Sequence, residues 1–160
     1  MRSEQEVNRA VDRYADLIRR LCMIYLKNEA DTEDIFQTVF LKYVLSSVSF
    51  ENEEHEKAWF VRVTINACKD LLKSFFRSRT TSLEVLMELP AEMPEEHREV
   101  LDAVLSLPRK YREVIYLHYY EGCSAPQISR ILGKNVNTIY TLLTRSKHML
   151  REKLGGEGYE

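Results

Sequence analysis

The chain has 160 residues, of which 44% are apolar and 30% are charged, and its formal net charge is −2. These values are typical of one or two small globular domains and exclude a fibrous or largely disordered chain. A net charge so close to zero also argues against a protein that binds nucleic acid over its whole surface.

The charges are arranged in alternating blocks. Residues 1–56 carry seven basic and twelve acidic side chains, whereas residues 57–79 carry six basic and one acidic. Residues 80–107 carry one basic and seven acidic side chains, and residues 108–154 carry nine basic and three acidic. We therefore expect two basic surfaces for nucleic acid, separated by acidic segments that repel phosphate or meet a basic protein partner.

The amino-terminal part predicts two successive helices. Apolar residues recur at intervals of three and four over residues 7–25, which predicts a helix that ends near Asn28. Asp31 is expected to cap the next helix, and its polar face includes Asp34 and Gln37.

A polar loop is predicted from Ser46 to Glu56, followed by a third helix over about 57–76. One face of this helix is expected to be a basic stripe within roughly 80°, at 100° per residue. A solvated surface is the simplest interpretation of such a stripe, but interleaved aromatic residues favour nucleic acid. The aromatic residues are Trp59, Phe60, Phe75 and Phe76, and the stripe consists of Arg62, Asn66, Lys69, Lys73 and Arg77.

Residues 79–94 contain two prolines and little periodicity, which predicts a flexible linker. The linker divides an all-α chain into two small helical domains, 1–78 and 95–160. The second domain is expected to begin with helices over 95–105 and 108–120.

The stretch 119–154 predicts a helix-turn-helix. Ser124 and Gln127 have the spacing of a capping box at the start of its first helix. Gly133 permits a sharp turn, after which Asn135 can cap the second helix.

Helical periodicity assigns two faces to this second helix. The inward face is predicted to consist of Ile139, Leu142, Leu143, Ser146, Met149 and Leu150. The outward face is predicted to consist of Asn137, Tyr140, Thr141, Thr144, Arg145 and His148. This polar, partly basic face suits recognition of the major groove, with Arg145 as the principal charged contact, although similar hairpins occur in purely structural bundles.

No catalytic or metal site and no cofactor is predicted. Phosphate-binding loops and nucleophile motifs are missing, and Cys22, Cys68 and Cys123 lack the spacing of a zinc site or disulfide framework. We expect these cysteines to be buried and His118 to pack among apolar residues. The apolar stretch 17–26 contains two arginines and resembles neither a leader nor a membrane span, so a cytoplasmic protein without membrane insertion is expected.

Several short blocks follow one another in an order known from one family. They are TEDIFQTVF at 32–40, Trp59-Phe60 with Asn66 and Asp70, LPRKYREV at 107–114, EGCS at 121–124 and LGKNVNTI at 132–139. Together they resemble the motifs of bacterial RNA polymerase sigma factors of the extracytoplasmic-function group. The resemblance covers most of the chain.

The resemblance implies a non-enzymatic protein that binds RNA polymerase core enzyme and promoter DNA, and an anti-sigma protein as a further partner. Asp34 and Gln37 correspond to contacts with the clamp coiled coil of the largest catalytic subunit. Residues that hold and melt the proximal (−10) promoter element would be Arg62, Asn66, Lys69 and Lys73. Residues that contact the distal (−35) element would be Asn137, Tyr140, Thr141, Thr144, Arg145 and Lys147.

The chain also departs from the family pattern. Tyr140 and Leu142 replace the usual basic residues, and residues 50–56 are acidic near the family's site for a flipped base, which leaves the base preference open. Two alternatives remain. One is a sigma-like regulator that binds polymerase or an anti-sigma protein without recognising DNA, and the other is a conventional repressor or activator.

Overall fold

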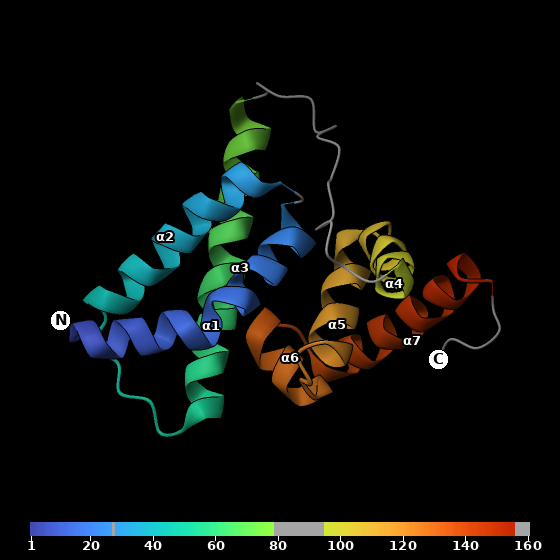
Figure 1. Ribbon diagram of the computed structural model, residues 1–160. Helices are drawn as coiled ribbons and strands as arrows, with labels where there is room; N and C mark the ends of the chain where they lie inside the picture. The colour runs from blue at the N-terminus through green and yellow to red at the C-terminus, as the bar shows by residue number, and fades with distance from the viewer. Residues whose placement is uncertain (27, 79–94, 156–160) are drawn as a thin grey trace. The chain divides into compact units, whose positions relative to one another are not determined.

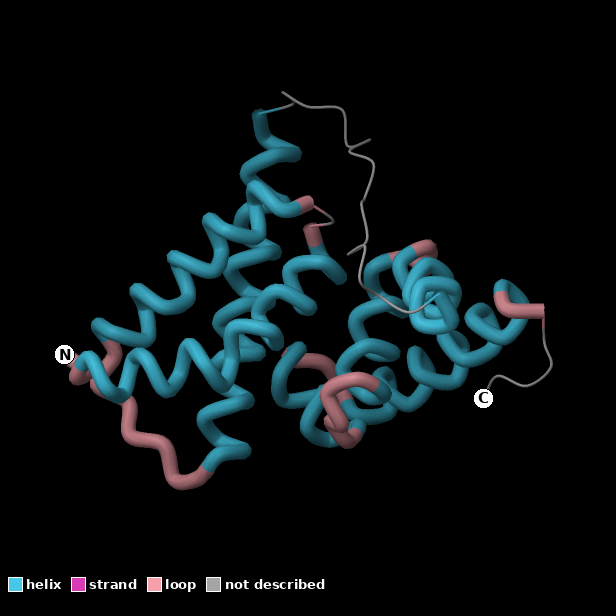
Figure 2. The backbone as a smooth tube through the Cα atoms, in the orientation of Figure 1, coloured by secondary structure: helices cyan, strands magenta, loops and turns pink. Residues whose placement is uncertain are grey.

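The computed structural model describes residues 1–26, 28–78 and 95–155, with side chains except at 75–78 and 95–98. These residues form seven α-helices and no strand, which confirms the predicted all-α class (Figures 1 and 2). The chain divides into two compact units, Met1–Glu88 and Leu89–Glu160, and the predicted linker 79–94 lies outside the described residues. The helices are α1 (Glu4–Tyr25), α2 (Glu29–Leu45), α3 (Glu53–Ser78), α4 (Glu95–Leu105), α5 (Arg109–Tyr119), α6 (Ala125–Leu132) and α7 (Val136–Lys153).

The boundary between α1 and α2 differs from the prediction. Helix α1 ends at Tyr25, and Asn28 caps α2 by accepting a hydrogen bond from the Asp31 backbone N–H at 2.8 Å. The prediction that Asp31 is the cap is therefore wrong. Asp31 lies in the first turn, where its carboxylate suits the positive end of the helix dipole and accepts from Asn28 Nδ2 at 2.6 Å.

Helix α3 begins earlier than predicted. Asn52 Oδ1 accepts a hydrogen bond from the His55 backbone N–H at 2.9 Å, so the helix starts at Glu53 and the predicted loop to Glu56 is too long. Glutamates in the first turn of α3 suit the helix dipole, which explains how an acidic stretch can open a helix.

The core of the first unit lies between α1, α2 and α3, which pack on one another. Phe60 is 0% exposed and joins the three helices through ring contacts. Its ring centroid lies 4.4 Å from Tyr14, 5.0 Å from Tyr43, 5.6 Å from Phe40 and 5.0 Å from Trp59. The fold of this unit therefore depends on Phe60, whose truncation to alanine would cost about 3–5 kcal/mol.

The cysteine predictions are confirmed in part. Cys22 and Cys68 are fully buried, with their Sγ atoms 3.9 Å apart, and the hydrogen bond to Cys22 together with burial raises the pKa of Cys68. Cys123 is only half-buried. His118 is packed as expected, and its Nδ1 lies 2.9 Å from the Cys123 carbonyl oxygen.

In the second unit, α5 packs against α4, α6 and α7. It begins at Arg109, one residue later than predicted, with Pro108 as the preceding cap residue. The largest fully buried side chains at the centre are Leu105, Leu107, Ile115, Leu117, Ile128 and Ile139.

The described residues contain neither a candidate membrane span nor a candidate metal site. None of these helices is both long and apolar enough to cross a membrane. The same residues contain no group of three or more His, Cys, Asp or Glu side chains that could hold a metal ion.

Candidate nucleic-acid and polymerase interfaces

The local geometry of the helix-turn-helix follows directly from its sequence. Ser124 Oγ accepts from the Gln127 N–H at 3.2 Å, and Gln127 Oε1 accepts from the Ser124 N–H at 2.8 Å, which confirms the capping box. Gly133 has a φ of 67°, a left-handed conformation that favours glycine. Asn135 then caps α7 by accepting from the Asn137 N–H at 2.8 Å.

The turn of this motif is held against α5 by interactions that the sequence did not predict. Glu113 on α5 is 3% exposed, and its carboxylate lies 3.7 Å from Lys134 Nζ in the turn. Ser129 Oγ donates to the Lys134 carbonyl oxygen. At the far side, Ser146 Oγ on α7 donates to the Tyr111 carbonyl oxygen of α5 at 3.2 Å. The turn and the middle of α7 are therefore both fixed on α5, which sets the direction in which α7 faces solvent.

The predicted outward face of α7 is exposed at every position, whereas Met149 and Leu150 on the predicted inward face are only half-buried. Two hydroxyl groups on the outward face already have partners. Thr141 Oγ1 donates to the Asn137 carbonyl oxygen at 3.1 Å, and Thr144 Oγ1 donates to the Tyr140 carbonyl oxygen at 3.0 Å. These threonines therefore offer methyl groups and oxygen lone pairs to a ligand, because the hydroxyl hydrogens are engaged.

Two cations of α7, Arg145 and Lys147, lie at the edges of this face, whereas the exposed Arg151 falls between them in angle, about one turn further along the helix. At 100° per residue, Arg145 and Lys147 are roughly 160° apart around the helix, with Asn137 and Thr144 between them. Both cations are exposed, and Lys147 Nζ lies 5.6 Å from the centroid of the Tyr119 ring on α5. Over residues 137–148 the centre of the face is uncharged and its rims are basic.

The stripe on α3 has the opposite arrangement. Arg62, Lys69 and Lys73 fall within roughly 40° of one another, so the cations form a line along the helix. Arg62, Asn66 and Lys73 are exposed and Lys69 is half-buried, while the side chain of Arg77 lies outside the described residues.

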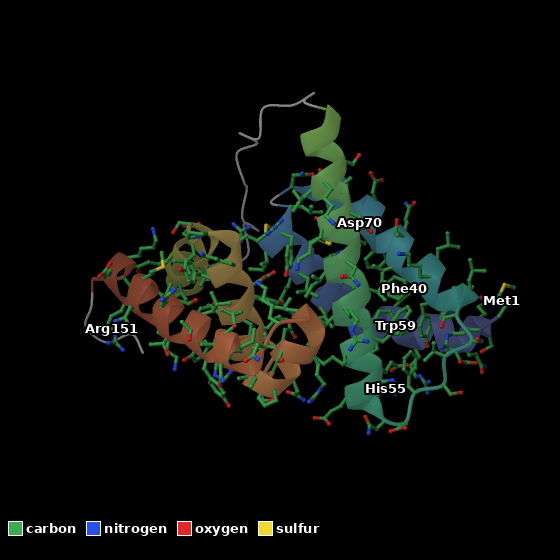
Figure 3. The ribbon with its side chains drawn as sticks, turned by 180° about the vertical axis from the view of Figure 1, so that it is seen from behind. Met1, Phe40, His55, Trp59, Asp70 and Arg151 are labelled. Atoms are coloured by element: carbon green, nitrogen blue, oxygen red, sulfur yellow. The ribbon has the colours of Figure 1, made fainter. Side chains whose placement is uncertain are left out.

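Of the four aromatic residues predicted beside this stripe, the structure describes the side chains of Trp59 and Phe60. Phe60 is fully buried in the core, so it does not contribute to the surface that carries the stripe. Trp59 is half-buried and meets Tyr43 and Phe50 with its edge, at centroid distances of 5.9 and 6.0 Å (Figure 3). The side chains at 75 and 76 lie outside the described residues.

A third surface lies on α2. Asp34 and Gln37 are exposed, as is Thr38. Two large apolar residues on the same face, Leu41 and Leu45, were not predicted as part of it and are 60% and 65% exposed. The five residues lie within roughly 100° of the helix circumference. The two leucines could have been found in the sequence, because positions 34, 38, 41 and 45 are three or four residues apart and so share a face that does not contain the core positions.

Family models match both units of the chain. Residues 10–79 match the model described as sigma-70 region 2, and residues 97–150 match the one described as sigma-70, region 4. The helix-turn-helix and the basic stripe therefore lie in two regions of one class of DNA-binding transcription factors.

Individual relatives agree with these matches. The RNA polymerase sigma factor SigV of Bacillus subtilis (strain 168) is 30% identical over 141 residues, covering 86% of this chain and 84% of the relative. The extracytoplasmic-function sigma factor SigW of the same organism is 29% identical over 161 residues, covering 90% and 86%.

Solved structures of low identity share the fold. The sigma factor RpoE from Bartonella quintana, solved with the anti-sigma factor NepR, aligns with a TM-score of 0.78 at 22% identity and covers 96% of this chain and 99% of that one. CnrH in complex with the cytosolic domain of CnrY aligns with a TM-score of 0.68 at 20% identity, covering 98% and 92%.

The chain belongs to the extracytoplasmic-function group of the sigma-70 family of RNA polymerase sigma factors. It is a non-enzymatic initiation factor that directs RNA polymerase core enzyme to promoters.

Proposed function

We propose that this sigma factor acts in the cytoplasm through three separate binding surfaces, each with its own partner. The exposed face of α2 binds core polymerase, the cationic line on α3 holds the melted strand of the proximal promoter element, and the outward face of α7 binds the distal element. The observation that carries this proposal is the exposure of all three surfaces on helices whose opposite faces form the cores of the two units.

The face of α2 is suited to a protein partner. It combines a carboxylate, an amide and a hydroxyl with the two exposed leucines Leu41 and Leu45. Large apolar side chains exposed next to polar groups are typical of protein interfaces, and the polar groups fix orientation and partner choice. The charge of Asp34 also makes this face unsuited to DNA.

The line on α3 is suited to a single strand. Arg62 and Lys73 are eleven positions apart and so roughly 16 Å apart along the helix axis, at 1.5 Å per residue. A row of cations of this length can follow consecutive phosphates of one strand, and Asn66 lies within the row to contact a base. Binding of this type releases counterions and should weaken steeply with salt.

The face of α7 is suited to a major groove. Cations at its two rims can approach the phosphate backbones on either side, while Asn137 and the threonine methyl groups approach base edges at its centre. An asparagine side chain can bond an adenine in bidentate fashion, and threonine methyl groups can contact the methyl group of thymine. We therefore expect a distal element that contains A·T pairs opposite the centre of α7.

An anti-sigma protein is a further proposed partner. The sigma factor RpoE, which shares the fold, was solved in complex with the anti-sigma factor NepR, and the exposed leucines of α2 give a comparable inhibitor an apolar surface to cover. An inhibitor bound there would compete with core polymerase for the same face.

The test begins with core binding and transcription in a purified system. Asp34→Ala/Gln37→Ala should reduce co-elution with core enzyme and promoter-directed transcription, because both exposed side chains lie on the α2 face. The matched control is Asp12→Ala/Gln5→Ala, which removes the same two residue types from exposed positions of α1.

Equal behaviour of the two double variants would refute the assignment of α2. If the parent chain binds core polymerase without directing transcription from any genomic fragment, the alternative of a regulator that does not recognise DNA is supported instead.

A further inference from the structure

The loop between α2 and α3, residues 46–52, is held in place by a residue from the start of the chain. The beginning of α1 lies beside the end of α2, where this loop departs (Figures 1 and 2). The Arg2 backbone N–H donates to the Val44 carbonyl oxygen at 3.2 Å, and Arg2 Nε donates to the Tyr43 carbonyl oxygen at 2.9 Å. These two carbonyl groups belong to the last turn of α2, where the regular i+4 donors are missing, and the Tyr43 carbonyl oxygen also accepts from the Ser46 backbone N–H at 3.2 Å.

The same guanidinium reaches into the loop. A second nitrogen, Nη2, donates to the Val48 carbonyl oxygen, and Nη1 lies 3.4 Å from a carboxylate oxygen of Glu6. The guanidinium carbon lies 4.3 Å from the Tyr43 ring centroid and 5.2 Å from that of Phe50. The Arg2 side chain is only 12% exposed. One side chain thus joins the end of α2, the loop backbone and the loop's aromatic residue.

Other contacts complete the ordering of the loop. Phe50 lies parallel to Tyr43 at 6.4 Å and edge-on to Trp59 and His55. The Glu51 N–H donates to His55 Nδ1 at 3.1 Å. Phe50 is half-buried, whereas the side chains of Ser47, Val48, Ser49, Glu51 and Asn52 are exposed.

We propose that Arg2 is a positioning residue for base selection, because it fixes the conformation in which this loop presents its exposed side chains to an unstacked base of the proximal promoter element. The inference rests on the proposed function, in which the first unit holds the melted strand. Discrimination between bases requires hydrogen-bonding groups held at fixed positions, and a loop of small polar residues has no such rigidity of its own. Arg2 supplies it with donors in a fixed planar fork, which lysine cannot reproduce.

The test uses holoenzyme reconstituted from the full chain and core polymerase. Its affinity is measured for single-stranded oligonucleotides of the non-template strand with each of the four bases at each proximal position. Arg2→Ala should reduce the ratio between the best and the worst base by about fivefold or more, the equivalent of one net hydrogen bond, without weakening core binding. Arg2→Lys should show most of the same loss, because charge alone does not hold the loop.

The matched control is Arg13→Ala. Arg13 is also an arginine of the first unit, but its Nη1 lies 3.1 Å from Glu53 and 3.7 Å from Glu56. Both of its ion pairs are therefore with α3 and not with residues 46–52. This variant should keep the parent's base ratio. Amide hydrogen exchange at Val48 and Glu51 should become faster in Arg2→Ala and stay unchanged in Arg13→Ala.

Three results would overturn the inference. If the parent discriminates between bases and Arg2→Ala and Arg2→Lys retain the same ratio, Arg2 does not position the loop for selection, and the proposed function stands. If the parent binds the oligonucleotides but shows no discrimination at any proximal position, the inference fails and the strand-holding role of the first unit stands. If the parent does not bind them at all, that role fails together with the inference.

Discussion

The two proposed DNA-binding surfaces carry their charge in opposite arrangements. On α3 the cations Arg62, Lys69 and Lys73 run in one line with an amide inside it, whereas on α7 Arg145 and Lys147 occupy opposite rims of an uncharged centre. A central line of charge favours one phosphate backbone and little discrimination between bases. Charge at the rims favours two backbones and leaves the centre free for base edges. The difference predicts that the α3 line contributes salt-dependent affinity and the α7 face contributes sequence preference, apart from the base selection proposed for the loop at residues 46–52.

The largest expected effect lies at the centre of α7. Asn137→Ala should remove a bidentate contact and reduce preference for one base pair of the distal element by about 1–3 kcal/mol, roughly 5- to 150-fold. Binding of holoenzyme to a set of promoters with single changes in this element measures the preference. Asn8→Ala, at an exposed position of α1, is the control and should keep it. A uniform loss over all promoters in Asn137→Ala would assign Asn137 to the backbone instead.

The next effect concerns the line on α3. Arg62→Ala/Lys73→Ala should weaken promoter binding by roughly tenfold and lower the salt slope by roughly 1.5, because about two phosphate contacts are lost. Permanganate reactivity of the melted bases should fall as well, while core binding stays intact. Arg9→Ala/Arg13→Ala removes the same amount of charge from exposed positions of α1. Undiminished reactivity in the α3 variant would show that its stripe is only a solvated surface.

A smaller effect is expected when charge is added to α7. Tyr140 is 54% exposed on the outward face of α7. Tyr140→Arg should strengthen promoter binding and steepen the salt slope by about 0.9, the value for one additional phosphate contact. Tyr140→Phe is the control for loss of the hydroxyl. An unchanged slope in Tyr140→Arg would place this position away from the DNA backbone.

The smallest effect concerns the threonine methyl groups. Thr141→Ser/Thr144→Ser keeps both hydroxyl groups and removes both methyl groups, so preference for thymine over uracil in the distal element should fall by at most about 1–2 kcal/mol, the transfer free energy of two such groups. Thr138→Ser, outside the centre of the face, should have no such effect. If the double variant keeps the parent's preference for thymine over uracil, the proposed methyl contacts are contradicted.

The sequence predicted best where structure is determined locally. The capping box of Ser124, the turn at Gly133 and the cap at Asn135 depend on neighbouring residues, and the two faces of α7 follow from helical periodicity. The predicted cap of α2, Asp31, was wrong because Asn28 and Asp31 are both good capping residues, and sequence alone did not decide between them.

Interactions between distant residues could not be predicted. Adjacent aromatic residues on a helix point roughly 100° apart, and the burial of Phe60 rather than Trp59 is decided by Tyr14 and Tyr43 on other helices. Likewise, the ion pair that holds the helix-turn-helix on α5 and the contacts of Arg2 with the loop join segments whose proximity is a property of the fold. Site positions on exposed helix faces were therefore available from sequence, whereas the contacts that orient them were not.

The central claim is that the rims of the α7 face contact phosphates and its centre contacts base edges. The most direct test compares one promoter with a second in which the distal element is scrambled. Holoenzyme binding is measured on both for Arg145→Ala and Asn137→Ala. The account predicts that Arg145→Ala weakens binding to both promoters by the same factor, whereas Asn137→Ala weakens binding only to the intact promoter. A loss in Arg145→Ala that is confined to the intact promoter would contradict it, because the rim would then recognise bases.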